Sequence, residues 1–224
     1  EFTRANMSDG LWFAEGFTSY YEPLTMQRAG LADIGRLASR LGTTLDTVIR
    51  SPARKYRSAE EVSRLAQFVD QASWSDPTNF ENAFLSYYTW GAAIGLGLDL
   101  SLRSRTDHRV TLDDYMRRLW RDYGRVEPPA EGGVARPYAI QDLRDVLADV
   151  TGDRSFANEF FDRHVQGREV VDYQQLLARG GLLLQKSRLG RAWIGPVALD
   201  FGEGTARITA PTIEDTPAYM AGLD

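Results

Sequence analysis

The sequence contains no cysteine among its 224 residues and only two histidines. Without cysteine a framework of disulfide bonds is excluded. The compartment stays open, because proteins of the bacterial cytoplasm and of the bacterial periplasm can equally lack cysteine.

The chain also lacks a long apolar run and an excess of basic residues. No window approaches the ~18 consecutive apolar residues of a membrane-spanning helix, and the N-terminus has no basic segment followed by an apolar one. The 26 basic and 31 acidic residues give a net charge of −5, which provides no basic face for nucleic acid. The sequence therefore predicts a soluble protein without a membrane span and without a nucleic-acid partner.

Apolar residues recur at helical spacing through most of the first 180 residues. Leu37, Leu41 and Leu45 belong to one such stripe, and Ser58 followed by Glu61 is typical of a capping box at a helix start. We expect helices at about 9–29, 31–51, 58–69, 77–105 with one break, 111–124, 139–152 and 155–167, and a short one within 171–181.

Three glycines, Gly91, Gly95 and Gly97, lie within the expected helix 77–105. Each weakens a helix by ~1 kcal/mol relative to alanine, so we expect another element to pack closely on that face. The residues expected in the core lie on apolar helical faces: Trp12, Tyr20, Leu24, Phe84, Leu96 and Leu119.

The composition changes near residue 181. Residues 125–138 are rich in proline and glycine and are expected to form an exposed loop, whereas 181–210 have the pattern of short strands. Pro217 suits the first turn of a final helix. The sequence thus predicts a mainly α fold: a helical bundle at 1–180, followed by a short β segment within 181–224 that forms a second unit.

Two acidic residues in the first expected helix are candidates for a metal site. Glu15 and Glu22 project from one helical face, two turns apart, with Ser19 between them. One carboxylate could ligate a metal while the other orients a neighbouring ligand. On spacing alone, a solvated acidic stripe is the commoner explanation.

The surrounding motif resembles a known family. The string LWFAEGFTSYYEPL is similar to the segment W-x-x-E-G-x-T-x-Y-Y of the glycyl aminopeptidases, which are zinc metallopeptidases of the gluzincin type that carry a PDZ domain. FLSYYTWGAAIGLGLDLSLRSRT, TLDDYMRRLW and FFDRHVQGREVVDYQQLLARGGL resemble later helices of that family. WIGPVAL and TPAYMAGLD resemble the first part of a bacterial PDZ domain. The resemblance covers nearly the whole chain, in order.

The resemblance implies roles for particular residues. The family binds zinc through two histidines of a His-Glu-x-x-His helix and through the glutamate of the W-x-x-E-G segment, which is Glu15 here. A carboxylate is an ordinary third zinc ligand beside two imidazoles. Tyr88, with Tyr87 as the alternative, matches a tyrosine that donates a hydrogen bond to the oxyanion of the tetrahedral intermediate. Trp90 stands where the family usually has lysine.

The two histidines do not complete such a site. Neither His108 nor His164 belongs to a His-Glu-x-x-His sequence, and we expect His108 in a loop and His164 on the surface of a helix. We therefore interpret the chain as a C-terminal fragment of a catalytic region that lacks the zinc-binding histidines and the general-base glutamate.

Two functions follow from this interpretation. In the first, the parent protein is a zinc aminopeptidase for peptides with a small N-terminal residue, glycine or alanine, and the fragment alone binds no zinc and is inactive. In the second, the chain is a non-catalytic helical module whose PDZ-like end binds a peptide as an added strand. A His-Glu-x-x-His sequence upstream would favour the first.

Overall fold

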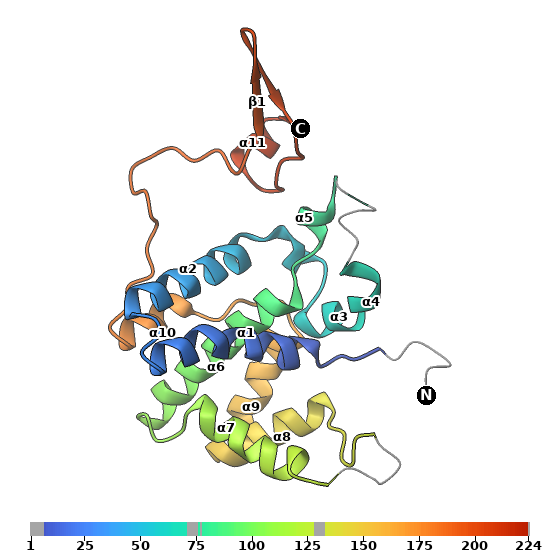
Figure 1. Cartoon of the computed structure of the whole chain (residues 1–224), viewed down its shortest axis with the longest axis vertical. Coiled ribbons are helices and arrows are strands. Elements are labelled where there is room, and N and C mark those ends of the chain that lie inside the picture. The colour runs from blue at the N-terminus through green and yellow to red at the C-terminus, as the bar shows by residue number, and fades with distance from the viewer. Residues whose placement is uncertain (1–6, 71–75, 77, 128–132, 224) are drawn as a thin grey trace.

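A computed structural model describes residues 7–70, 76, 78–127 and 133–223 of the chain. Helices form its main body, and two short strands stand at one end of it (Figure 1). The longer helices are α1 (Leu11–Arg28), α2 (Ile34–Arg50), α6 (Tyr87–Thr106), α7 (Leu112–Leu119), α8 (Ile140–Thr151), α9 (Arg154–Phe160) and α10 (Tyr173–Arg179).

The shorter elements lie between these helices or after them. They are the 3-10 helix η1 (Pro52–Lys55), the helices α3 (Ala59–Arg64), α4 (Ala66–Val69), α5 (Phe80–Ala83) and α11 (Pro217–Met220), the π-helical turns η3 (Trp120–Gly124) and η4 (Phe161–Val165), and the strands β1 (Leu199–Gly202) and β2 (Thr205–Ile208). The predicted fold class, mainly α with a small β segment near the C-terminus, is confirmed. No helix in the described ranges is long and apolar enough to cross a membrane.

Helix boundaries follow the local chemistry of the sequence. Gly30, with a φ of 72°, follows α1, and Asp33 caps α2 by accepting a hydrogen bond of 2.7 Å from the N–H of Arg36. The second helix therefore begins three residues later than the apolar pattern predicts. Ser58 and Glu61 form the expected capping box at α3, with hydrogen bonds of 3.2 and 2.7 Å. The expected single break in 77–105 lies between α5 and α6.

Helices α1 and α6 pack against each other at a crossing of two glycines. A Cβ atom on Gly91 would collide with the carbonyl oxygen of Trp12 and would lie 2.7 Å from the Cα atom of Gly16. The two backbones are therefore in direct contact. A Cβ on Gly97 would lie 2.8 Å from Val171, and one on Gly95 would lie 3.3 Å from Phe17. These contacts explain why the apolar helix tolerates all three glycines.

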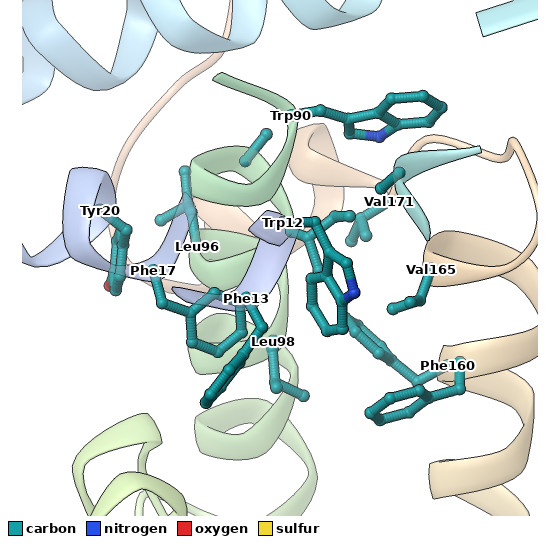
Figure 2. Close-up of a cluster of buried hydrophobic side chains, with 14 of the residues drawn as sticks. Trp12, Phe13, Phe17, Tyr20, Trp90, Leu96, Leu98, Phe160, Val165 and Val171 are labelled. Carbon is teal, nitrogen blue, oxygen red and sulfur yellow. The ribbon is translucent and has the colours of Figure 1, made fainter. Parts of the chain in front are cut away.

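Aromatic side chains from α1 fill the space beside this crossing. Trp12, 1% exposed, makes edge-to-face contacts with Phe17 and Phe161 at ring-centroid distances of 5.7 and 6.0 Å (Figure 2). Tyr20, Leu96 and Leu119 are also buried, as predicted. Leu24 and Phe84, likewise expected in the core, are half-buried and pack against it.

A buried carboxylate ties three helices together. Asp99 of α6 accepts hydrogen bonds from the Tyr20 hydroxyl at 2.9 Å and from the backbone N–H of Leu112 at 2.9 Å, and it pairs with Arg103 at 3.1 Å. Because its oxygens are satisfied by these donors, the acid can be accommodated in the core. Neither spacing nor motif in the sequence predicts this arrangement.

The C-terminal residues differ in part from the prediction. β1 and β2 pair antiparallel, with Leu199 opposite Ile208, and Pro217 begins α11 as expected. Residues 182–198 contain no strand, so the short strands predicted there are wrong. A strand requires a neighbouring strand for its backbone hydrogen bonds. Here Arg191 bonds back to Arg188 in a turn, and the carbonyl of Ile194 accepts from Ala218.

This C-terminal segment contacts the helical body through polar groups. The Asn82 side chain donates to the carbonyl of Thr212 at 3.1 Å and accepts from the N–H of Glu214 at 2.9 Å. The Tyr56 hydroxyl lies 2.8 Å from the Glu214 carboxylate.

The loop predicted at 125–138 is exposed where the structure describes it. Residues 125–127 and 133–138 are exposed on either side of it, as expected. Residues 128–132 of that loop lie outside the described ranges.

The helix crossing gives a direct stability prediction. Replacing Gly91 with alanine is expected to lower the free energy of unfolding by about 3 kcal/mol, because the added methyl group collides with backbone rather than with a movable side chain. A Cβ atom on Gly42 in α2 would meet no neighbouring atom within 4 Å, so Gly42→Ala is expected to stabilise by ~0.5–1 kcal/mol. Urea unfolding measures both. Equal effects of the two substitutions would contradict the close crossing.

Candidate active site

Glu15 and Tyr88 lie close together because of the glycine crossing. Glu15 directly precedes Gly16 on α1, and Tyr88 lies one turn before Gly91 on α6. Glu15 is half-buried, whereas the Tyr88 side chain is exposed. Partial burial raises the pKa of Tyr88, and the charge of Glu15 together with a hydrogen bond to it raises this pKa further. The two side chains therefore interact directly.

Tyr87, the alternative to Tyr88, lies in a different environment. It is 3% exposed, and its hydroxyl donates to Oδ2 of Asp70 at 2.9 Å. Burial raises the pKa of Tyr87, and the hydrogen bond and charge of Asp70 act in the same direction. The rings of Tyr87 and Tyr88 are stacked, with centroids 4.9 Å apart and an angle of 30° between their planes. Tyr88 is thus the more accessible of the two side chains, and Glu15 is the neighbouring acceptor for its hydroxyl.

Glu15 and Glu22, the two acidic residues predicted for a metal site on α1, differ in their basic neighbours. Glu15 forms no ion pair with a basic side chain in the part of the chain that the structure describes, so its charge is available to a cation. Glu22 is exposed, and its carboxylate lies 3.9 Å from Arg40 of α2. The structure therefore does not bring Glu22 to Tyr88. An orienting role for Glu22 would require a partner outside the described residues.

The described residues bring no group of three potential metal-ligating side chains together. Glu15 nevertheless fits a metal ligand by its chemistry: it is a partly accessible carboxylate without a basic partner among the described residues. Carboxylate oxygen is a normal zinc ligand. The remaining protein ligands would have to come from residues other than those described around Glu15.

The position of His164 corrects the prediction of a surface histidine. It is 9% exposed, its Nδ1 lies 2.9 Å from the carbonyl oxygen of Glu169, and its ring lies 5.1 Å from that of Phe160. The helix widens into the π-helical turn η4 at this point, which changes the face that the residue occupies. His108 is exposed in the turn after α6, with a φ of 61°, as expected.

Two other residues around the site have positions that the sequence alone does not reveal. Trp90, which replaces the usual lysine of the family pattern, is 2% exposed and belongs to the core. Asp70 reaches Tyr87 from the end of α4. Nothing in the spacing of the sequence points to this contact, because it depends on how α4 lies relative to α6.

Comparison with known proteins finds similarity to aminopeptidases. The M61 glycyl aminopeptidase family matches residues 1–94, a range that includes both Glu15 and Tyr88. The crystal structure of an aminopeptidase N family protein from Idiomarina loihiensis is similar over the whole chain, with a TM-score of 0.73 and 26% sequence identity. The chain spans 38% of the length of that protein. No curated protein matches the sequence significantly.

Both matches are to peptidases of the aminopeptidase type. The match over residues 1–94 supports the resemblance to the M61 glycyl aminopeptidase family that the W-x-x-E-G segment indicates.

The burial of His164 predicts a pH dependence of stability. Burial lowers the pKa of His164 in the folded protein, so below its ordinary value of ~6.5 the unfolded chain binds the proton more readily. The free energy of unfolding is therefore expected to fall as the pH decreases through ~6.5. His164→Gln should reduce this slope, whereas His108→Gln, at the exposed histidine, should leave it unchanged. Urea unfolding over a pH series measures the effect; equal slopes for both variants would contradict it.

Proposed function

We propose that this chain is the helical part of the catalytic region of a zinc aminopeptidase that acts on peptides with a small N-terminal residue, glycine or alanine. In this proposal residues 1–180 belong to the catalytic domain and 181–224 begin a PDZ-like domain. The observation that carries the proposal is the contact between Glu15 and Tyr88, which come from different helices. The family match over residues 1–94 suggests the reaction class, and the contact between Glu15 and Tyr88 suggests the site.

Glu15 is proposed as the zinc ligand that this chain supplies. When bound, zinc would act as a Lewis acid that polarises the carbonyl of the scissile peptide. The carboxylate suits this role because it is half-buried and is not neutralised by a basic side chain among the described residues.

Tyr88 is proposed as the donor to the oxyanion. A tyrosine phenol is protonated at neutral pH, and the raised pKa of Tyr88 favours this form further, so the hydroxyl has a proton to donate. Negative charge develops on the carbonyl oxygen of the substrate during attack, and a donor already in place stabilises it. Without substrate, Glu15 is the neighbouring acceptor for this hydroxyl. It would exchange this acceptor for the substrate oxygen as the reaction proceeds.

The roles of Glu15 and Tyr88 can be tested in the longer protein of which, in this proposal, the chain is a part. Glu15→Gln is expected to lower zinc content and turnover together, because an amide is a poorer zinc ligand than a carboxylate. Tyr88→Phe is expected to retain zinc and to lower kcat by about 100-fold to 1000-fold, the usual cost of losing an oxyanion donor. Metal analysis and hydrolysis of glycine and alanine p-nitroanilides measure these effects.

Asp46→Asn, at an exposed carboxylate paired with Arg50 on α2, is the matched control and should change neither zinc content nor turnover. A Glu15→Gln enzyme with unchanged zinc content and turnover would show that Glu15 is a structural acid. A parent protein that hydrolyses neither p-nitroanilide would favour the non-catalytic peptide-binding module instead.

The chain of 224 residues contains no His-Glu-x-x-His sequence, so by itself it is expected to retain no stoichiometric zinc. One carboxylate cannot replace a site with three protein ligands. Equilibrium dialysis against zinc, followed by metal analysis, measures retention. One equivalent held at submicromolar free zinc, together with chelator-sensitive cleavage of a p-nitroanilide, would show that the chain makes a complete site by itself.

A further inference from the structure

Asp70 and Tyr87 form a second carboxylate–phenol pair directly beside Tyr88 and Glu15. The Tyr87 hydroxyl donates to Oδ2 of Asp70 at 2.9 Å, across 17 positions of sequence. Tyr87 is buried, whereas Asp70 is exposed at the end of α4. The pair therefore connects the surface near α4 with the first turn of α6, where Tyr88 also lies.

Tyr87 is held at both ends of its side chain. Its ring is buried against the core, and its hydroxyl is fixed by Asp70. The exposed ring of Tyr88 stacks on this fixed ring, with centroids 4.9 Å apart. An exposed tyrosine otherwise has several side-chain conformations, and a fixed neighbouring ring favours those in which the two rings remain stacked.

The hydroxyl groups of Tyr87 and Tyr88 have different carboxylate partners. Asp70 accepts the hydrogen bond of the Tyr87 hydroxyl, and Glu15 is then the neighbouring carboxylate that can accept from Tyr88. The two phenols are close enough for each to influence the pKa of the other. Without Asp70, the buried Tyr87 hydroxyl would lack this acceptor and would compete for Tyr88 or Glu15, because a buried donor without a partner is costly.

We propose that Asp70 and Tyr87 are positioning residues, which hold the Tyr88 hydroxyl in the orientation required for oxyanion binding. This inference rests on the proposed function, in which Tyr88 is the donor. Asp70 and Tyr87 themselves do not touch the substrate. They act through the ring of Tyr88, and they therefore affect the turnover step rather than zinc binding.

The test uses the longer protein with zinc bound. Asp70→Ala and Tyr87→Phe are each expected to lower kcat by about tenfold or more, as misplacement of a catalytic group does, with KM and zinc content unchanged. Because the two residues act as one unit, the double variant should be no slower than the slower single variant. Asp70→Asn keeps an oxygen acceptor for Tyr87 and should restore most of the lost turnover.

Asp46→Ala, at an exposed carboxylate of α2, serves as the surface control and should leave kcat unchanged. Tyr88→Phe is measured in parallel. If it leaves kcat unchanged, the proposed function fails. If it lowers kcat but the Asp70 and Tyr87 variants do not, or if their effects simply add, only the positioning role is overturned.

A second readout does not depend on turnover and uses the chain of 224 residues. With ¹³C-labelled tyrosine, Glu15→Gln is expected to shift the Cζ resonance of Tyr88, because the charge of Glu15 acts on the Tyr88 hydroxyl. In an Asp70→Ala background this shift should become smaller, since Tyr88 is held less firmly against Glu15. A shift of unchanged size in that background would contradict the positioning role.

Discussion

The direct backbone contact between α1 and α6 at Gly16 and Gly91 is the constraint on which the rest of the structure depends. With no side chain between the helices, only one register is compatible with the crossing. Trp12 and Phe17 then occupy the space on either side of it. The glycines weaken their helices, but they allow two aromatic-rich surfaces to pack without a gap.

The same crossing determines the candidate site. Glu15 is adjacent to one glycine and Tyr88 lies one turn from the other, so any shift of either helix would separate them. Further along, Asp99 bonds α6 to Tyr20 of α1 and to the start of α7. The two helices are thus joined at two places, and the proposed site lies on a rigid frame rather than on a loop. Sites on rigid elements hold their geometry most accurately.

Much of this frame could be predicted from the sequence. Apolar periodicity and capping residues indicate the helices, because both depend on residues near in sequence. The glycines in an apolar helix indicate a close approach of another element. The W-x-x-E-G segment points to Glu15 through family resemblance. Periodicity alone did not separate Glu15 from an ordinary acidic stripe.

The contacts that could not be predicted connect residues distant in sequence. The sequence around Asp99 and Asp70 does not indicate that these carboxylates accept hydrogen bonds from tyrosine hydroxyls, because the tyrosines are distant in sequence. The burial of His164 depends on a π-helical turn that has no clear sequence signal. The prediction of strands within 182–198 is wrong because it also depended on local pattern alone. Strand formation requires a partner strand, which local pattern does not specify.

The most direct test of the account is a crystal structure of the longer protein with zinc and a transition-state analogue that carries an oxyanion. The account predicts that Glu15 ligates the zinc and that the Tyr88 hydroxyl, rather than that of Tyr87, lies within hydrogen-bonding distance of the analogue oxygen. Zinc held without Glu15, or an analogue oxygen bound by Tyr87 or by neither tyrosine, would contradict it.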